Sequence, residues 1–428
     1  MRSRRLSAHV PIGIALAGML TPLAPGMSAA TVPEDTPTGS ANSVPSENVR
    51  LLHRVWERVN EHFYDESFCG ADWQAVKQRY TGPAYEAASK AALAEVINAM
   101  LAELHTSHTA FYTVEDREYH QLRDIFSEPD PLGHGDREVF RYEGIGIFSD
   151  EIDGRIFIAA VIDGTPAERA GLKRGDEIIS VDGKPFETVG SFKGKAHTPV
   201  RMHIRRTVDP DDTRAISVVP EWIRPTEMFL EAIKHSTRVF RHDGARVGYV
   251  HVWSYAGAGN HDALKDGLTE EPLKDVDALV LDLRDGWGGA QADYLNLFNA
   301  RLPVLTMQAR DGPPRCLDRQ WRKPVVLVVN ERTRSGKEIL AYGFRVYGIG
   351  TVVGSRTAGA VVGGRPFIMF DGSLLYLAVQ DVRVDGRRLE GIGVEPDIVV
   401  PFDLRYSAGA DPRLDRAIQV AAEQVQSS

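Results

Sequence analysis

The sequence predicts an α/β multidomain fold in which a helical unit and a strand-rich unit precede an α/β core. Three patterns predict it. Apolar residues recur at helical spacing over residues 49–126, short strands alternate with turns over 140–223, and buried strands alternate with helices over 226–428. The chain has 428 residues, which is enough for two or three domains of ~100–200 residues each.

The first 30 residues have the pattern of a secretory signal. A basic start is followed by a short apolar stretch and by small residues that end at Ala30, after which we expect cleavage. Arg4 and Arg5 leave the twin-arginine route open beside the general secretory route. The apolar stretch is shorter than the ~20 residues of a membrane span, so no stable membrane insertion is expected. We therefore expect an exported protein, periplasmic or secreted, with a flexible Pro-, Ser- and Thr-rich leader at 31–48.

The charge of the chain excludes one class of partner, and its cysteine content limits how disulfides can stabilise the fold. The formal net charge is -9 and the chain has no long basic run, which argues against a nucleic-acid surface. Cys69 and Cys316 allow at most one disulfide, and their spacing does not show whether they pair. The fold must therefore depend on hydrophobic cores. The sequence leaves the oligomeric state open, and a homo-oligomer is compatible with it.

The helical unit at 49–126 contains the stretch "KAALAEVINAMLAEL". Its apolar residues share one helix face: Leu93, Val96, Met100, Leu101 and Leu104. The helix runs into "HTSHTAF", where His105, Ser107 and His108 gather at a helix end. A histidine there interacts favourably with the negative end of the helix dipole, which alone would account for it.

A Pro- and Gly-rich linker, "SEPDPLGHGD", follows the helical unit. His134 lies between Asp130 and Asp136, but the prolines and the lack of ligand spacing favour a solvated loop over a metal site. We expect no metal and no cofactor.

The strand-rich unit at 140–223 contains "GTPAERAGLKRGDEIISVDG", which predicts a short helix over 166–170 that ends at Gly171. This stretch and the strands around it resemble a PDZ domain. By that resemblance Gly144, Ile145 and Gly146 occupy the position that binds a peptide C-terminus, while the adjacent strand accepts the peptide as a new strand.

The core contains two continuous apolar runs, "VDALVLDLR" and "PVVLVVN", which predict strands covered on both faces. "DGWGG" at 285–289 follows the first run and "ERTRSGKE" follows the second. If the two strands are parallel neighbours, both loops emerge at the same edge of the sheet. A glycine-rich turn and Ser335 would then face one crevice.

Ser335 has two readings. With Glu338 it forms a capping box at a helix start, which explains the local pattern without any chemistry. As a nucleophile it would attack a carbonyl, and the amides of Gly336, Gly288 and Gly289 would bind the developing oxyanion. The turn "DGWGG" can equally be only a tight turn.

The order of the helical unit, the PDZ-like unit, "LDLRDGWGG", "VVNERTRSGKE", "VVGSRTAGAVVG" and "EGIGVEPDI" resembles the C-terminal processing (tail-specific) proteases and the related tricorn core proteases. The resemblance covers residues 49–401 and implies a crotonase-like or Clp-protease-like α/β core. It places Ser335 on the serine nucleophile. Arg332 and Arg334 stand where the family has a run of small Ser and Ala residues.

The resemblance also bears on the base. Serine/lysine members of the family place a lysine where this chain has Ala360. Lys337 cannot replace it because residues two apart on a helix do not face each other. If His108 is the base, replacing Lys337 by alanine is expected to be nearly silent for turnover.

The tricorn-type variant instead takes its base from the helical unit. By resemblance this assigns the base to His108, its orienting hydroxyl to Ser107 and the acid to Glu390, with an imidazole accepting the Ser335 proton. Gly336 stands where the tricorn proteases have an aspartate that selects basic side chains, so basic specificity is not expected.

These patterns imply an exported serine endopeptidase that hydrolyses flexible or C-terminal polypeptide segments through an acyl-enzyme, with the PDZ-like unit binding or gating the substrate. The main alternative is a catalytically inactive periplasmic PDZ scaffold in which Ser335 only caps its helix. An esterase that uses the same nucleophile is a third reading.

Overall fold

The computed structural model describes residues 46–126 and 140–427. The signal, the leader and the linker residues Asp130, His134 and Asp136 lie outside the described residues. No helix within the described ranges has the length and apolar character needed to cross a membrane. Both cysteines, Cys69 and Cys316, are exposed and free, so they do not pair.

The helical unit consists of α1 (Glu47–His62), α2 (Trp73–Glu86), α3 (Lys90–Ala102) and α4 (Arg117–Ile125), with the short η1 (Phe68–Gly70) and β1 (Ala110–Tyr112). Serine hydroxyls cap two of the helices: Ser46 accepts the Val49 amide proton at 3.3 Å and Ser89 accepts that of Ala92 at 3.1 Å. The expected apolar face of α3 is confirmed in its main members, which are buried: Leu93, Met100, Leu101 and Leu104. Ile97 is also buried there, and Val96 is only partly covered.

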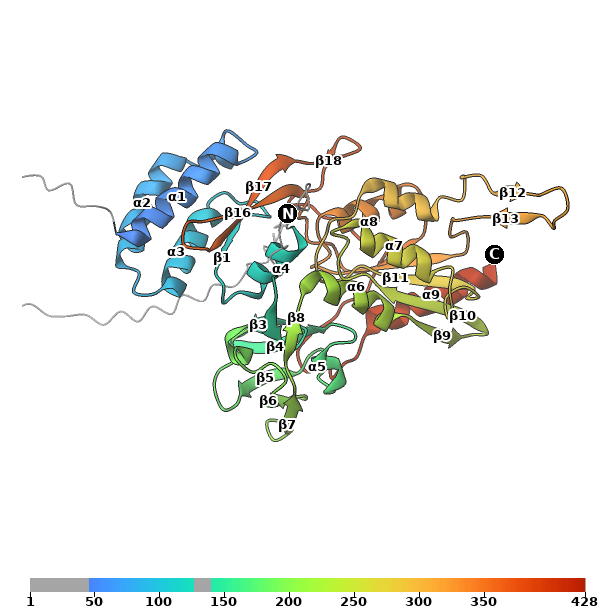
Figure 1. Ribbon diagram of the computed structural model, residues 1–428, viewed down its shortest axis with the longest axis horizontal. Helices are drawn as coiled ribbons and strands as arrows, with labels where there is room; N and C mark the ends of the chain where they lie inside the picture. The colour runs from blue at the N-terminus through green and yellow to red at the C-terminus, as the bar shows by residue number, and fades with distance from the viewer. Residues whose placement is uncertain (1–45, 127–139, 428) are drawn as a thin grey trace, which may run out of the picture. The chain divides into compact units, whose positions relative to one another are not determined.

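A hairpin from the second half of the chain completes the helical unit. β16 (Val362–Ile368) and β17 (Leu374–Asp381) pair with each other, and β17 pairs antiparallel with β1. Leu375 and Leu377 are fully buried in the same hydrophobic cluster as α1, α2 and α3. Figure 1 shows β16 and β17 beside these helices. Residues more than 250 positions apart in sequence therefore share one core.

The PDZ-like unit contains an antiparallel sheet in the order β3-β4-β5-β6-β7 and a separate pair of β2 with β8. Their bounds are β2 Tyr142–Gly144, β3 Ile147–Ile152, β4 Arg155–Val161, β5 Glu177–Val181, β6 Val200–Arg205, β7 Thr213–Val218 and β8 Glu221–Ile223. The expected short helix is α5 (Pro166–Arg169), and Gly171 follows it with a φ of 77°, the left-handed conformation that glycine adopts at low cost. The short η2 (Gly190–Phe192) precedes β6.

The core is built on a six-stranded sheet in the order β20-β15-β14-β11-β10-β9, parallel except for β9. The strands are β9 Arg238–His242, β10 Ala245–His251, β11 Ala278–Asp282, β14 Val325–Val329, β15 Thr351–Gly354 and β20 Ile398–Val399. Its helices are α6 Pro225–Ser236, α7 Ala258–Gly267, η3 Ala292–Phe298, α8 Gly336–Val346 and α9 Pro412–Ser427. Two small hairpins, β12 (Leu305–Met307) with β13 (Arg315–Leu317) and β18 (Arg383–Val384) with β19 (Arg387–Arg388), complete it.

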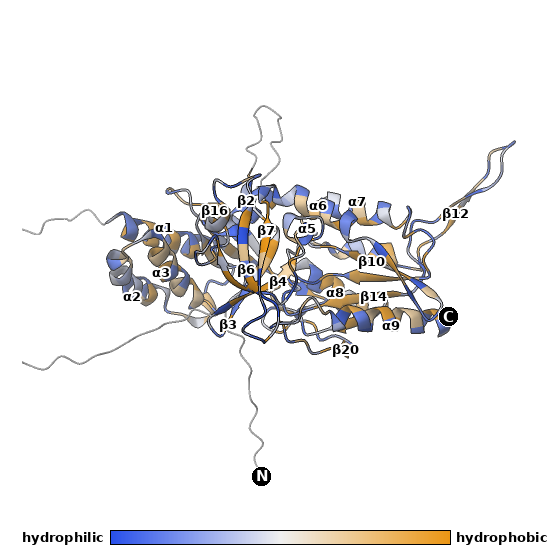
Figure 2. Ribbon diagram, turned by 90° about the horizontal axis from the view of Figure 1, so that it is seen from below, coloured by the Kyte–Doolittle hydropathy of each residue, from blue (hydrophilic) through white to orange (hydrophobic). Residues whose placement is uncertain are grey.

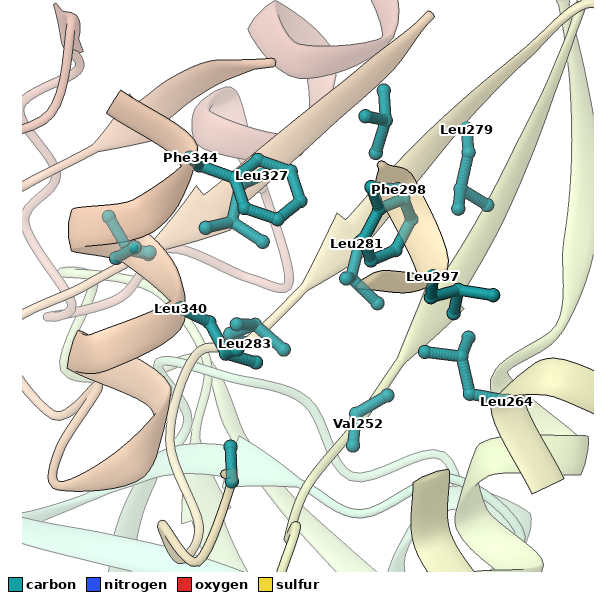
Figure 3. Close-up of a cluster of buried hydrophobic side chains, with 14 of the residues drawn as sticks. Val252, Leu264, Leu279, Leu281, Leu283, Leu297, Phe298, Leu327, Leu340 and Phe344 are labelled. Atoms are coloured by element: carbon teal, nitrogen blue, oxygen red, sulfur yellow. The ribbon is translucent and has the colours of Figure 1, made fainter. Parts of the chain in front are cut away.

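Helices cover both faces of this sheet, as the continuous apolar runs predict. Alternate residues such as Leu281 and Leu327 pack with Leu340 and Phe344 of α8 on one face (Figure 3). Residues such as Val280 pack against α9 on the other face. Every residue of β11 and β14 is buried, and Figure 2 shows β14 as mainly hydrophobic. The two strands are therefore held in fixed register beneath the loops that follow them.

Candidate active site

The two glycine- and serine-bearing loops meet at one edge of the sheet. β11 and β14 are parallel neighbours, with Asp282 opposite Val328, so the loops after them leave side by side. A Cβ placed on Gly288 would lie 2.4 Å from the Ser335 Cβ and 3.0 Å from its Oγ. Only glycine fits at this position, which brings the backbone of the turn against Ser335. The expected meeting of the two loops is confirmed.

Ser335 has an unusual backbone. Its φ of 57° and ψ of -131° lie in a region that side chains other than glycine rarely adopt, at a cost of ~1–3 kcal/mol. The Glu338 half of the capping box is present, because the Ser335 amide donates to Glu338 Oε2 at 3.1 Å. The Ser335 hydroxyl makes no well-aligned hydrogen bond to an amide of that turn. A strained serine between a strand and a helix is typical of an exposed nucleophile.

The amides expected to bind an oxyanion lie around Ser335. Gly336 is the first residue of α8, where the amides have no partner within the helix. A Cβ on Gly336 would lie 2.2 Å from the Ala290 carbonyl oxygen, so this glycine also permits a close backbone approach. Within residues 46–126 and 140–427, the amides of Gly288, Gly289 and Gly336 donate to no backbone carbonyl. These amides are available for a ligand, and their role stays a prediction.

Glu390, Ser107 and His108 form a hydrogen-bonded chain. The Ser107 hydroxyl donates to Glu390 Oε2 at 2.9 Å and lies 2.8 Å from His108 Nδ1. Backbone amides hold the same carboxylate: Ser107 donates to Oε1 at 2.7 Å and Val361 donates to Oε2 at 2.7 Å. The three residues that the sequence assigned to the base and its support are thus brought together from segments 283 residues apart.

This chain sets the tautomer of His108. A carboxylate only accepts hydrogen bonds, so the Ser107 proton points at Glu390 and its oxygen is left to accept from His108 Nδ1–H. The other ring nitrogen, Nε2, then carries the lone pair and can act as a base. Burial, and next the charge of Arg334, lower the pKa of His108 to about 3, so the ring is neutral near pH 7.

Two adjacent residues, Ala360 and Val361, bond to Ser335 and to the acid that supports His108. The Ala360 carbonyl accepts the Ser335 amide at 2.9 Å, and the next residue, Val361, donates to Glu390. No hydrogen bond joins His108 to Ser335 in the part of the chain that the structure describes. Catalytic hydrogen bonds are often long without substrate and tighten in the substrate complex.

The sequence does not indicate most of the hydrogen bonds that Glu338 makes. Its buried carboxylate accepts from the Gly359 amide at 2.7 Å, the Ala360 amide at 2.8 Å and the Thr357 hydroxyl at 2.5 Å. It therefore ties the start of α8 to the segment around Ala360. The capping box gave a local signal for Glu338, but no local pattern indicates its contacts 19 to 22 residues away.

Lys337 has a structural role that its position in the sequence does not indicate. It is fully buried and does not face Ser335; its Nζ donates to the carbonyls of Trp253 and Asp285, each at 2.9 Å. Burial lowers its pKa to about 7. Removing the side chain would leave the buried Asp285 carbonyl without this donor, whereas the Trp253 carbonyl would keep the Trp287 amide at 2.8 Å. The expectation that replacing Lys337 is nearly silent for turnover stays a prediction.

We expect Lys337→Met to lower the free energy of unfolding by ~1–3 kcal/mol, since the buried Asp285 carbonyl loses its donor and the Trp253 carbonyl keeps only the Trp287 amide. Urea titration followed by tryptophan fluorescence measures this change. Lys274→Met is the control because Lys274 is exposed, and it should shift stability by no more than ~0.5 kcal/mol. Equal unfolding midpoints for the two variants would contradict the structural role of Lys337.

The PDZ-like loop is covered in this structure. Gly144, Ile145 and Gly146 are all buried, and a Cβ on Gly146 would lie 2.4 Å from Thr165. Arg117 of α4 donates to the Ile147 carbonyl at 3.1 Å, at the start of the edge strand β3. A peptide terminus can reach this loop only if the covering contacts open.

Comparisons with known proteins agree with these units. The model of the Tricorn protease C1 domain matches residues 47–102, a PDZ domain model matches 157–206, and the model of Peptidase family S41 matches 246–400. These matches follow the order of the helical unit, the PDZ-like unit and the core.

Two curated relatives span most of the chain. Tricorn protease homolog 1 of Streptomyces coelicolor is 27% identical over 372 residues, which cover 85% of this chain and 34% of the relative. Carboxyl-terminal-processing peptidase 3, chloroplastic, of Arabidopsis thaliana is 25% identical over 373 residues, which cover 82% of this chain and 68% of the relative. The chain thus spans about a third of the length of the tricorn relative.

A solved structure shows the same fold. The crystal structure of the tricorn protease matches with a TM-score of 0.55 and 21% identity over 90% of this chain and 37% of that chain. Together with the three domain matches, this identifies the α/β multidomain architecture. These findings support a C-terminal processing protease family with a PDZ domain, and residues 246–400 match peptidase family S41, whose members are serine-type peptidases.

Proposed function

We propose that this protein is an exported serine endopeptidase that hydrolyses flexible or C-terminal polypeptide segments through an acyl-enzyme. The observation that carries the proposal is the chain Glu390–Ser107–His108, which orients the ring of His108 so that Nε2 carries the lone pair. The strained backbone of Ser335 and its contact with Gly288 support the same role.

In the proposed reaction the Ser335 Oγ attacks the peptide carbonyl carbon while its proton passes to His108 Nε2. The negative charge on the carbonyl oxygen is stabilised by the amides of Gly336 and Gly288. The imidazolium then gives the proton to the leaving amine, and the C–N bond breaks. Water, deprotonated by His108, attacks the acyl-enzyme and releases the acid and Ser335.

Glu390 and Ser107 support the charged form of the base in this mechanism. The carboxylate lies one hydroxyl away from Nδ1, so it stabilises the imidazolium through the Ser107 oxygen. Its two amide donors fix its position and keep the Ser107 hydroxyl aimed at it.

The PDZ-like unit is proposed to gate this site. Its carboxylate-binding loop at 144–146 is buried and α4 lies against it, with His120 stacked on Tyr142 at 5.2 Å between ring centres. Binding of a polypeptide C-terminus there requires α4 to move, and α4 follows directly on the segment of His108 and β1. Opening of the PDZ-like loop would thus be coupled to the position of the base.

Labelling of the purified protein with a fluorophosphonate, followed by peptide mass mapping, tests the proposal. We expect an adduct on Ser335 that is lost in His108→Ala, because an unactivated serine does not react. A labelled trypsin sample controls for reagent quality. Absence of any adduct under conditions in which trypsin reacts would instead favour a PDZ scaffold without catalysis.

A further inference from the structure

Arg334, the residue immediately before Ser335, is fixed beside the candidate site. Its neighbour Thr333 is fully buried and donates its hydroxyl proton to the Leu283 carbonyl at 3.1 Å. The backbone carbonyl of Arg334 accepts the Lys337 amide proton at 3.2 Å. The guanidinium Cζ lies 5.7 Å from the centre of the Trp287 ring, which belongs to the glycine turn. The half-buried side chain is therefore held over the turn that contacts Ser335.

The positive charge of Arg334 has no carboxylate partner among residues 46–126 and 140–427. Nearby guanidinium groups do have one: Arg332 pairs with Asp150 and, at 3.4 Å, with Asp285, and Arg117 pairs with Glu118. A half-buried guanidinium loses hydration that an ion pair would replace. Arg334 is thus left to bind an acidic group from outside the described chain.

The charge of Arg334 affects the pKa of His108 and of two other side chains near it. After burial, it is the second cause that lowers the pKa of His108. Burial raises the pKa of Tyr376 to about 12, and Arg334 opposes that shift. The pKa of Glu118 is lowered overall: burial raises it, but Arg117 and, more weakly, Arg334 lower it by more. The Glu118 carboxylate already bonds to Arg117, so it is not the partner of Arg334.

We propose that Arg334 binds a carboxylate of the peptide substrate beside the scissile bond and thereby selects acidic substrates. The carboxylate is either an Asp or Glu side chain next to the bond or the free C-terminus of the substrate. A guanidinium suits both because it donates two parallel hydrogen bonds to a carboxylate. This inference rests on the proposed peptidase function and names its substrate class.

Neutralisation of Arg334 would have a second effect at the base. Because the guanidinium disfavours a protonated His108, a bound carboxylate removes part of that penalty and lets Nε2 accept the Ser335 proton more readily. A substrate carboxylate would therefore hold the substrate at Arg334 and would also make His108 a stronger base.

The test uses peptides built on a real cleavage site. Digestion of reduced casein and mass mapping supply the best cut sequence, which is then synthesised in four forms: Glu or Gln next to the bond, each with a free or an amidated C-terminus. We expect one carboxylate to raise kcat/KM by about 10- to 100-fold over its neutral counterpart. The Glu and Gln pair reports on a side chain, and the acid and amide pair reports on the C-terminus.

Variants assign that preference to one residue. Arg334→Gln should reduce the preference to less than about threefold while neutral peptides are still cleaved, and Arg334→Lys should retain part of it. Arg241→Gln on β9, an exposed arginine at the far edge of the sheet, should keep the full preference. Equal cleavage of all four peptides by the unaltered protein, a preference that survives Arg334→Gln, or an equal loss for neutral and acidic peptides would each overturn the proposal.

Binding separates this inference from the peptidase proposal. Fluorescence anisotropy of the same four labelled peptides on the Ser335→Ala protein reports recognition without turnover. Carboxylate-dependent binding that disappears in Ser335→Ala/Arg334→Gln supports Arg334 even if no peptide is hydrolysed, in which case only the proposed reaction fails. Equal affinity for acidic and neutral peptides counts against Arg334. Fluorophosphonate labelling of Arg334→Gln at Ser335 shows that this variant is folded.

Discussion

Replacing Ser335 by alanine is expected to lower peptide turnover by ~10³-fold or more, because the proposed reaction depends on the Ser335 hydroxyl as its nucleophile. Turnover is measured with the peptide that casein mapping identifies, over at least a hundredfold range of enzyme concentration. The free energy of unfolding should change by no more than ~0.5–2 kcal/mol, the usual effect of a lost cap. Turnover within tenfold of the unaltered protein would exclude Ser335 as the nucleophile.

Ser335→Gly is a useful companion variant. It also lacks the hydroxyl, but glycine adopts a φ of 57° without the strain that alanine keeps there. We therefore expect Ser335→Gly to be more stable than Ser335→Ala by about 1 kcal/mol, although both are inactive. This comparison separates the chemical loss from the backbone effect.

Replacing His108 by alanine is expected to lower kcat/KM by ~10²–10⁴-fold, the usual contribution of a general base. Lys337→Met, which also removes a proton acceptor, should mainly lower stability, because the Lys337 amine is turned to the carbonyls of Trp253 and Asp285. Turnover of both variants should be measured below the unfolding midpoint of the less stable one. An inactive Lys337→Met beside an active His108→Ala would reverse the assignment of the base.

The pH profile of kcat/KM gives a second check on His108. The base must be neutral, and its pKa in the free enzyme is lowered to about 3, below the usual 6.5 of histidine. Activity should therefore persist as the pH falls through 6.5 and should decline only at lower pH, provided that circular dichroism shows the protein still folded. An acidic limb at pH 6.5 or above would show that the charge of Arg334 and the burial of the ring do not govern this group.

The sequence was sufficient for the local features of the fold. The apolar runs of β11 and β14 predicted buried neighbouring strands because residues covered on both faces leave a continuous pattern. The resemblance to known families singled out His108, Ser107 and Glu390, which the structure brings into one hydrogen-bonded chain.

Features that depend on contacts between distant segments could not be predicted. The burial of Lys337 is one example: its position in a helix start gives no sign that Trp253 and Asp285 enclose it. The covered loop at 144–146 is another, because contacts with Thr165 and Ile223, distant in sequence, enclose it, and Arg117 of α4 bonds to the residue after it. In both cases the side-chain environment is set by tertiary packing, on which local propensity has no bearing.

The pairing of β1 with β17 determines how early in synthesis the candidate site can form. During synthesis the segment of His108 emerges long before residues 362–390, so the nascent chain has the base without the strand beside it or the acid that supports it. Closing so long a loop is slow compared with forming the helices. The hydrogen-bonded chain of Glu390, Ser107 and His108 would thus form only after residues 362–390 have been made.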